Sequence, residues 1–282
     1  MVSPIAVSAR PHRPLAVVTG AASGIGHALV RALLDRDLDV VAIDLATDAI
    51  DPRAHRWAVD VRDAGAMAAL AARFEGRPAS HVFANAGVGG QAGDAPGLPD
   101  DAWRWAWEVN MLGALRTLQL WWPHLRAGRG KAVATLSAAA LQSFPGAGPY
   151  RASKAALLAA LEGLHYGARG SGVSVHALCP GLVRTRIADV DRYAEALDGR
   201  PGGSLPANPF AAHLARAMQG AETAEAFAVR VLETLDRGAP FYWLTHDDTR
   251  AWTHARHRAI EGGGEPFSDF GAPATTVAEG VA

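Results

Sequence analysis

The sequence predicts an α/β protein with one three-layer, doubly wound parallel sheet, and three observations point to that fold class. Short apolar runs, typical of fully buried strands, alternate with segments of helical length and periodicity. Alternating strands and helices require right-handed crossovers, which place helices on both faces of the sheet. The chain has 282 residues, 49% of them hydrophobic, which suits one α/β core with long loops.

The expected elements follow one another from residue 15 onward. Strands are expected at residues 15–19, 39–44, 56–61, 81–85, 131–136 and 173–178. Helices are expected at residues 24–36, 64–74, 101–125 and 149–169. After a segment crowded with glycine and proline, the pattern predicts a helix at 221–237, an edge strand at 240–244 and a helix that begins within 245–248.

These elements define the expected domain organisation. Residues 1–13 are expected to be a flexible lead-in, and residues 14–261 one domain with a short C-terminal extension. A substrate loop is expected at about 182–220, with residues 199–209 as a candidate lid. Residues 262–282 are small and polar, and we expect a disordered tail there.

Charge and composition exclude several classes of function. The 27 basic and 28 acidic side chains give a formal net charge of -1, which provides no electrostatic footprint for nucleic acid or an anionic membrane. The sequence shows neither the apolar core of a signal peptide nor an apolar run approaching the roughly 20 residues of a membrane helix. Cys179, the single cysteine, excludes an intramolecular disulfide and is expected to be buried and inert. We expect a soluble, cytoplasmic protein.

A glycine-rich turn, residues 19–26, lies between the first strand and the first helix. Glycine lets the backbone approach a pyrophosphate closely, and the helix N-terminus offers unpaired N–H groups to it. The same composition would serve a purely structural turn. However, Asp44 ends the next strand twenty residues beyond Gly24, where an acid binds an adenosine ribose and repels a 2′-phosphate. With Leu45 after Asp44 and no basic residue in the turn, the pattern favours NAD over NADP.

Tyr150 and Lys154 are four residues apart at the start of an expected helix and therefore share one face. A lysine ammonium one turn away stabilises a phenolate, which suits the tyrosine to proton transfer near neutral pH. Taken alone, such a pair is more often an accident of a helix surface. Ser137, which ends the preceding strand, and Asn110, in the helix before it, change that judgement.

With these residues in place, the sequence resembles the short-chain dehydrogenase/reductase superfamily over roughly residues 14–187. The resemblance lies in motifs that occur in that family's order and spacing: the turn at 19–26, Asp60-Val61, Asn85-Ala86-Gly87, Asn110, Ser137, Tyr150-x-x-x-Lys154 and Pro180-Gly181. Two departures are Ala84, where many relatives carry asparagine, and the lack of a second serine beside Ser137.

The resemblance implies a role for each of four catalytic residues. Tyr150 would be the general acid/base, and Lys154 would bind the nicotinamide ribose and tune Tyr150. Ser137 would orient and polarise the substrate oxygen. Asn110 would hold a water molecule that links Lys154 to solvent and completes a proton relay.

The resemblance also implies a cofactor groove for NAD. Asp60 and Val61 would flank the adenine, while Val183 and Thr185 would hold the carboxamide. The full expected set is Gly20, Ser23, Gly24, Ile25, Gly26, Asp44, Asp60, Val61, Asn85, Ala86, Gly87, Tyr150, Lys154, Pro180, Gly181, Val183 and Thr185.

The substrate pocket is expected at the carboxyl ends of the strands. Three stretches would line it: residues 88–95, residues 138–149 and the loop that begins at residue 182. Its larger expected contributors are Leu141, Gln142, Phe144 and Pro145. Ser143 would either reach the substrate or be an ordinary loop residue. These predict a mostly hydrophobic alcohol or ketone as substrate. Arg184 and Arg186 would either meet an anionic group or face solvent.

Two further groups of residues invite a functional interpretation that we disfavour. His246, Asp247, Asp248, His254 and His257 match no known zinc spacing, so we expect no metal site but a helix N-terminus followed by a solvated face. Trp103, Trp105 and Trp107 cannot all face one side of a helix. With Trp121 and Trp122 they indicate packing and a subunit contact rather than ligand stacking, and we expect a homodimer or homotetramer.

The expected function is hydride transfer between NAD(H) and a mostly hydrophobic secondary alcohol or ketone. One alternative is an NADPH-dependent ketone reductase, against which Asp44 argues. A second is a catalytically silent NAD-binding protein on the same fold. The presence of Ser137, Tyr150 and Lys154 argues against that one.

Overall fold

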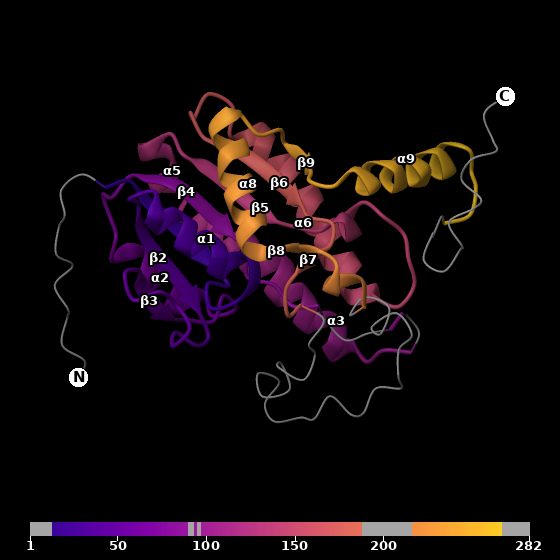
Figure 1. The fold of residues 1–282 in the computed structure, drawn as a ribbon, viewed down its shortest axis with the longest axis horizontal. Coiled ribbons are helices and arrows are strands. Elements are labelled where there is room, and N and C mark those ends of the chain that lie inside the picture. Colours follow the sequence, from indigo (N-terminus) through magenta and orange to yellow (C-terminus); the bar gives the residue numbers. More distant parts are fainter. Residues whose placement is uncertain (1–12, 90–92, 95–96, 188–215, 267–282) are drawn as a thin grey trace.

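A computed structural model of the chain describes residues 13–89, 93–94, 97–187 and 216–266 (Figure 1). The expected lid at 199–209 and most of the expected substrate loop at 182–220 lie outside the described residues, as do residues 1–12 and 267–282.

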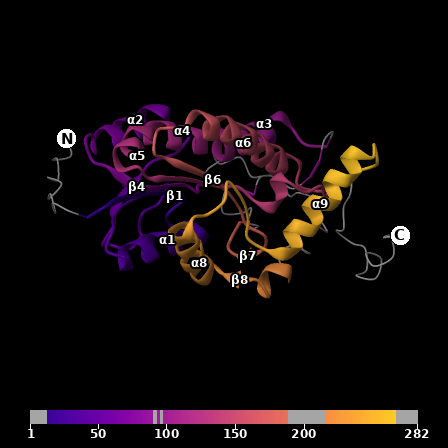
Figure 2. The ribbon, with the colours of Figure 1, turned by 90° about the horizontal axis from the view of Figure 1, so that it is seen from above.

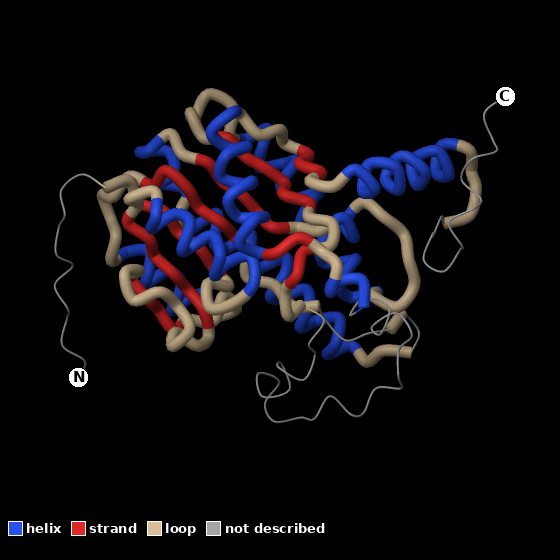
Figure 3. The backbone as a smooth tube through the Cα atoms, viewed as in Figure 1, coloured by secondary structure: helices blue, strands red, loops and turns tan. Residues whose placement is uncertain are grey.

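The described chain contains a seven-stranded sheet in the order β3-β2-β1-β4-β5-β6-β9, in which every pair of neighbours is parallel. The strands are β1 Leu15–Thr19, β2 Asp39–Asp44, β3 His55–Ala58, β4 Ala79–Ala84, β5 Lys131–Thr135, β6 Ser174–Cys179 and β9 Tyr242–Leu244. The strand order reverses between β1 and β4, so loops leaving these two strands diverge and open a crevice. This confirms the predicted doubly wound, Rossmann-type sheet, whose strands lie side by side in Figure 3.

Helices cover both faces of the sheet and make the third layer (Figure 2). One face carries α1 Gly24–Asp35 and α8 Ala224–Arg237, and the other carries α2 Ala64–Ala72, α3 Asp100–Trp107, α4 Ala114–Leu120, α5 Trp122–Gly128 and α6 Gly148–Gly167. Alternate side chains of β1 enter the two cores: Leu15 and Val17 join one, Ala16 and Val18 the other. The first four residues of the strand are therefore all apolar.

The prediction of one continuous helix at 101–125 was wrong. After α3 the chain makes a π-helical turn, η1 Glu108–Gly113, and then continues as α4. A second break falls at Trp121, whose ψ of 4° leaves the helical range before α5 begins. Pro123 in the first turn of α5 explains this break, because proline cannot donate a backbone hydrogen bond to the preceding turn. A π-turn inside a helix is frequently a functional feature.

Among the other boundaries that differ from the prediction, two bear on the cavity and its surroundings. The strand predicted at 56–61 ends at Ala58, and the residues that follow turn toward the crevice. The helix predicted from residue 221 begins at Ala224, because β8 Glu222–Thr223 pairs with β7 Val183–Arg184. Thr223 then caps α8, its Oγ1 accepting a hydrogen bond of 3.2 Å from the Ala226 N–H.

The C-terminal extension begins with β9, which pairs with β6 as the predicted edge strand. Helix α9, Asp247–Glu261, follows and extends away from the sheet (Figures 1 and 2). No described helix has both the length and the apolar character that crossing a membrane requires.

Candidate active site

A cavity of about 720 Å³ opens at the carboxyl ends of the strands, over the point where the strand order reverses. All of the residues predicted from the sequence for the cofactor and the chemistry line it, except Gly26 and Asn110. The register explains this convergence, since Thr19 at the end of β1 pairs with Ile43 near the end of β2 and the following turns leave at one edge. The volume is in the range of small-molecule sites.

The glycine turn has the backbone conformation that its sequence predicts. Gly20 and Gly24 have φ angles of +69° and +53°, a region that residues with a Cβ rarely adopt. Gly26 serves a different purpose from the predicted one. A Cβ there would lie 2.0 Å from the carbonyl oxygen of Gly20, so Gly26 allows the turn to pack closely rather than lining the cavity.

Asp44 joins the glycine turn to the end of β2. Its carboxylate accepts a hydrogen bond of 2.9 Å from the Ala22 N–H and one of 2.7 Å from the Leu45 N–H. The side chain also lines the cavity. A fixed negative charge therefore stands beside the turn, at the place where an adenosine ribose is expected.

The neighbouring end of the cavity contains a basic residue that the sequence pattern did not indicate. Arg62 lines the cavity beside Val61 and forms an ion pair of 2.7 Å with Asp60. Burial alone would raise the pKa of Asp60. Hydrogen bonds from the side chain and backbone of Arg62 outweigh burial and hold that pKa below its usual value. Asp60 is therefore a carboxylate at neutral pH.

Asn85 ties three strand ends together beneath the cavity. Its Nδ2 donates to the Thr19 carbonyl at 3.1 Å, and its Oδ1 accepts from the Thr135 hydroxyl at 3.0 Å. Its backbone N–H donates to Thr19 Oγ1 at 3.0 Å. The floor of the crevice is therefore fixed by one amide that contacts both β1 and β5.

Tyr150 and Lys154 lie on the first turns of α6, one turn apart, and both line the cavity. The Lys154 Nζ lies 5.9 Å from the centre of the Tyr150 ring and donates to the Thr135 carbonyl at 2.8 Å. Only 3% of Lys154 is exposed, and this burial lowers the pKa of its ammonium group to about 8. The lysine is thus charged below that pH and faces the tyrosine.

Asn110 is fully buried on the π-helical turn and holds α6 in place. Its Oδ1 accepts from the Val88 N–H at 2.8 Å, and its Nδ2 donates to the Val88 carbonyl and to Ser153 Oγ, both at 3.0 Å. Ser153 Oγ in turn donates to the Tyr150 carbonyl at 2.8 Å. The amide therefore positions the Tyr150 turn. The predicted water-holding role of Asn110 stays a prediction.

Ser137 begins the short 3₁₀ turn η2, Ala138–Ala140, which follows β5. Its Oγ accepts a hydrogen bond of 3.1 Å from the Ala139 N–H, and the hydroxyl retains a proton to donate. The Ala138 N–H donates to the Pro180 carbonyl at 2.7 Å. The serine turn and the predicted Pro180-Gly181 motif are therefore held against each other.

Arg151, next to Tyr150, fixes one wall of the substrate end. Its guanidinium donates to the Gln142 carbonyl at 2.9 and 3.2 Å and to the Phe144 carbonyl at 3.2 Å. It also packs over the Phe144 ring, with 5.3 Å between its Cζ and the centre of that ring. The loop that contributes Gln142 and Phe144 to the cavity is thus clamped to the helix that carries Tyr150.

The structure distinguishes the two arginines predicted near the substrate end. Both are exposed, but Arg186 lines the cavity, whereas Arg184 donates to the Ala221 carbonyl at 3.3 Å. Trp105 was assigned to packing and a subunit contact rather than to a ligand, but it lines the cavity while 8% exposed. Trp121 is fully buried, with its ring centre 5.7 Å from that of Phe74, as a packing role predicts.

The start of α9 contributes to the cavity. Asp248, Thr249 and Trp252, from the first turns of this helix, are among the lining residues, and their spacing puts them on one helical face. Residues 241–260 loosely resemble a C-terminal extension of some bacterial family members, for which either a cap over the substrate pocket or a subunit contact was expected, and the structure places this face at the cavity.

The predicted solvated face of α9 is correct for His254 and His257, which are exposed, and wrong for His246, which faces Gly181. Among the described residues, no three His, Cys, Asp or Glu side chains are grouped so as to hold a metal ion. Cys179 is buried, and burial raises the pKa of its thiol to about 12, which agrees with an inert thiol.

Fold and site together define a doubly wound α/β protein with a Tyr–Lys pair and a glycine turn in one cavity. A family model described as short chain dehydrogenase matches residues 14–196. The chain therefore belongs to the short-chain dehydrogenase/reductase family and is an oxidoreductase.

Three similar proteins place the chain within that family. The 2-(R)-hydroxypropyl-CoM dehydrogenase of Xanthobacter autotrophicus is 34% identical over 187 residues, which are 61% of this chain and 75% of that protein. The 1-hydroxy-2-glutathionyl-2-methyl-3-butene dehydrogenase of a Rhodococcus strain is 35% identical over 181 residues, 61% of this chain and 78% of that one. A crystal structure of a family member from Burkholderia phymatum, in complex with NAD, has a TM-score of 0.81 and 31% identity, covering 91% of this chain and 97% of that chain.

Proposed function

We propose that this protein transfers a hydride between NAD(H) and a mostly hydrophobic secondary alcohol or ketone. The observation that carries the proposal is the buried Lys154 ammonium, one turn from Tyr150, in a cavity that also contains the glycine turn. The bound nicotinamide would accept or supply the hydride. The reaction also needs a group that carries a proton and a group that donates a hydrogen bond to the substrate oxygen. The residues that line the cavity offer both.

Tyr150 is the proposed proton carrier. In alcohol oxidation its phenolate would accept the hydroxyl proton of the substrate, and in ketone reduction its phenol would donate one. Lys154 would stabilise the phenolate electrostatically, an effect strengthened by the low dielectric around a buried ammonium. Ser137 would donate a hydrogen bond to the substrate oxygen. We also propose that Asn110 holds a water molecule that connects Lys154 to solvent.

The proposed cofactor is NAD rather than NADP. Asp44 supports this, because its carboxylate is held at the ribose end by two backbone N–H groups and would repel a 2′-phosphate. The similar Burkholderia phymatum structure contains NAD. The proposed cofactor residues are those predicted from the sequence, with Gly26 acting through the packing of the turn.

The proposed substrate class follows from the side chains at the Tyr150 end. They are mainly apolar, among them Trp105, Phe144 and Trp252. Charged side chains of both signs, Arg186 and Asp248, also line the cavity, and Arg186 would suit an anionic group. Two relatives are named as dehydrogenases of hydroxy compounds linked to CoM or glutathione, so anionic hydroxyalkyl thioethers belong in a substrate screen beside apolar alcohols.

We further propose a cytoplasmic homodimer or homotetramer. Exposed apolar side chains on α3, η1 and α6 support an assembly, namely Trp107, Leu112 and Tyr166, which are 41%, 36% and 63% exposed. Light scattering of the purified protein measures the assembly directly, and a monomeric mass would contradict it.

The experiment that tests the proposed function combines cofactor titration with a substrate screen. NADH and NADPH are titrated by nucleotide fluorescence, and NADH formation is followed with cyclic, aromatic and steroid-like secondary alcohols and with hydroxyalkyl thioethers. We expect tighter binding of NADH and turnover of apolar alcohols. Tighter NADPH binding would instead indicate the NADPH-dependent reductase, and cofactor binding without turnover in either direction would indicate the non-catalytic protein.

A further inference from the structure

The side chain of His246 faces inward and contacts the backbone of Gly181. Its Nδ1 accepts a hydrogen bond of 3.0 Å from the Gly181 N–H and lies 2.8 Å from Thr245 Oγ1. The contact is close, because a Cβ added to Gly181 would lie 2.8 Å from the imidazole ring. His246 occupies the N-cap position of α9 in an extended conformation, but its side chain makes no capping hydrogen bond to the helix. It supports the Gly181 segment instead.

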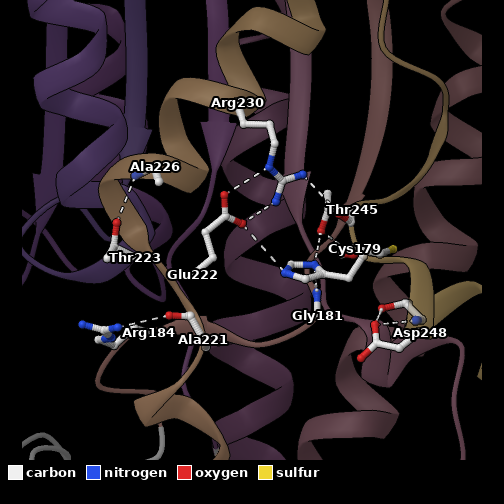
Figure 4. A network of polar contacts seen from close by, with 12 residues as sticks. Cys179, Gly181, Arg184, Ala221, Glu222, Thr223, Ala226, Arg230, Thr245 and Asp248 are labelled. Carbon is white, nitrogen blue, oxygen red and sulfur yellow. Dashed lines mark hydrogen bonds and ion pairs between the residues drawn. The ribbon is translucent and has the colours of Figure 1, made fainter.

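The ion pair between Glu222 and Arg230 lies on the other side of the imidazole, beyond hydrogen-bond distance of its Nε2. Glu222 Oε2 lies 3.8 Å from His246 Nε2, and Arg230 donates to both carboxylate oxygens of Glu222. Arg230 also donates to the Thr245 carbonyl at 3.1 Å. Figure 4 shows this network, which joins Glu222 and Arg230 to Thr245 above Gly181. The ring thus has contacts from β8, α8 and the turn after β9.

The hydrogen-bond pattern shows which nitrogen of the His246 ring binds the Gly181 backbone. Nδ1 accepts from a backbone N–H and therefore carries no proton, so the ring proton lies on Nε2, which faces Glu222. The essential feature is an acceptor at the position of Nδ1. Asparagine can offer an acceptor at nearly that position, whereas glutamine places its amide about one bond farther out, near Nε2.

Gly181 and the first turn of α9 both line the cavity. Gly181 belongs to the segment that lines it with Pro180 and Val183, while Asp248 and Thr249 follow His246 within the first turn of α9 and line its substrate end. The imidazole holds Gly181 at the start of α9, beside a hydrogen bond of 3.4 Å from the Thr245 N–H to the Cys179 carbonyl.

We propose that His246 is a positioning residue that fixes the Gly181 backbone, and through it the segment beside the nicotinamide ring, against the first turn of α9. The inference rests on the proposed function, because that function puts a nicotinamide in this part of the cavity. Loss of the Nδ1 acceptor leaves the Gly181 N–H without its partner and loosens the Gly181 backbone, while Pro180 remains bound to the Ala138 N–H. The nicotinamide half of the cofactor is then held poorly, while the adenosine half, bound by the glycine turn, is held as before.

The test compares binding of the whole cofactor with binding of its nicotinamide-free part. Dissociation constants for NADH and for ADP-ribose, and the single-turnover rate of hydride transfer, are measured for the wild type, His246→Leu, His246→Asn and His246→Gln. His254→Leu, at an exposed histidine of the same helix, is the matched control. If NADPH proves to be the cofactor, NADPH and 2′-phospho-ADP-ribose replace this pair.

We expect His246→Leu to weaken NADH binding and slow hydride transfer by about tenfold each, with ADP-ribose affinity within about twofold of the wild type. His246→Asn should recover most of both losses, whereas His246→Gln should resemble His246→Leu. His254→Leu should match the wild type. If His246→Leu fails to fold, the contrast between Asn and Gln carries the same test.

Three results would overturn the inference. The variants could all bind NADH and transfer hydride as the wild type does, or NADH and ADP-ribose could weaken equally, or Asn and Gln could behave alike. A wild-type protein that binds none of these nucleotides would instead refute the proposed function, on which the inference depends.

Discussion

The two ends of the cavity are built in different ways. At the cofactor end, backbone conformation determines the shape of the site: Gly20 and Gly24 adopt positive φ, and Asp44 holds the turn through backbone N–H groups. At the substrate end, side chains converge from the loop after β5, from α3, from the segment after β7 and from α9. The difference teaches that a backbone-determined site is recorded in short contiguous motifs, whereas a side-chain site depends on the packing of distant segments.

The largest effect of a substitution is expected at Gly26, where two backbone segments of the glycine turn are in close contact. In Gly26→Ala the new Cβ would lie 2.0 Å from the Gly20 carbonyl oxygen, which the turn cannot accommodate without moving. We expect at least about 100-fold weaker NADH binding and a free energy of unfolding lower by about 3 kcal/mol. Fluorescence titration and urea denaturation measure the two.

Gly163→Ala is the matched control, because Gly163 is exposed within α6 and a Cβ there would have no atom within 4 Å. That variant should be more stable by up to about 1 kcal/mol, since alanine favours a helix more than glycine does. Equal effects of the two substitutions would contradict a backbone-determined cofactor end.

The next effect is electrostatic and concerns cofactor choice. Asp44→Asn keeps the shape of the side chain and removes its charge, so the ratio of the NADPH to the NADH dissociation constant should fall by about 30-fold. Titration of both cofactors measures the ratio. Asp48→Asn removes an equal charge from an exposed residue that does not line the cavity and should leave the ratio unchanged. A similar change in both variants would show that net charge, not the position of Asp44, selects the cofactor.

A pH effect is expected from the buried Lys154. Its ammonium has a pKa lowered to about 8, so the charged form is present below that pH and is lost above it. If the ammonium binds the cofactor, the dissociation constant of NADH should rise up to about tenfold between pH 7 and pH 9. Lys154→Met should bind weakly and equally at both pH values. Affinity in the wild type that does not change over this range would exclude the ammonium from cofactor binding.

The smallest effect is expected at the substrate end. Trp252→Ala removes one half-buried side chain from a wall that several segments share, so KM for an apolar substrate should rise by about fivefold, with NADH affinity unchanged. Ile260→Ala, at a residue of the same helix that is 59% exposed, should change neither value. Equal losses of substrate and cofactor affinity in Trp252→Ala would show that the two ends are not separable.

How much the sequence predicts follows the same division. The buried strands were predicted closely because their apolar runs end in glycine or acidic residues: β1 and β2 have the predicted bounds. The glycine turn and Asp44 were predicted because each has a conformational or electrostatic requirement that few residue types meet. The π-helical turn at Glu108–Gly113 was not predicted, since no residue type marks such a turn and Asn110 on it bonds to Val88, which is distant in the sequence.

The substrate end shows what local patterns leave out. Trp252 has the sequence signature of any helical residue, and its place in the cavity depends on where α9 lies after β9 pairs with β6. His246 was read as part of a solvated face, because its partners Gly181 and Glu222 lie 65 and 24 positions away along the chain. Contacts between segments that are distant in the sequence determine the positions of both side chains.

The most direct test of the central claim is the Tyr150→Phe variant, which removes one hydroxyl from the cavity. NADH affinity by fluorescence and turnover of an active substrate are measured side by side with the wild type. Proton transfer by Tyr150 predicts turnover lower by at least about 1000-fold, with the NADH dissociation constant within about threefold of the wild-type value. Turnover at a rate comparable to that of the wild type would contradict the role of Tyr150 and with it the proposed mechanism.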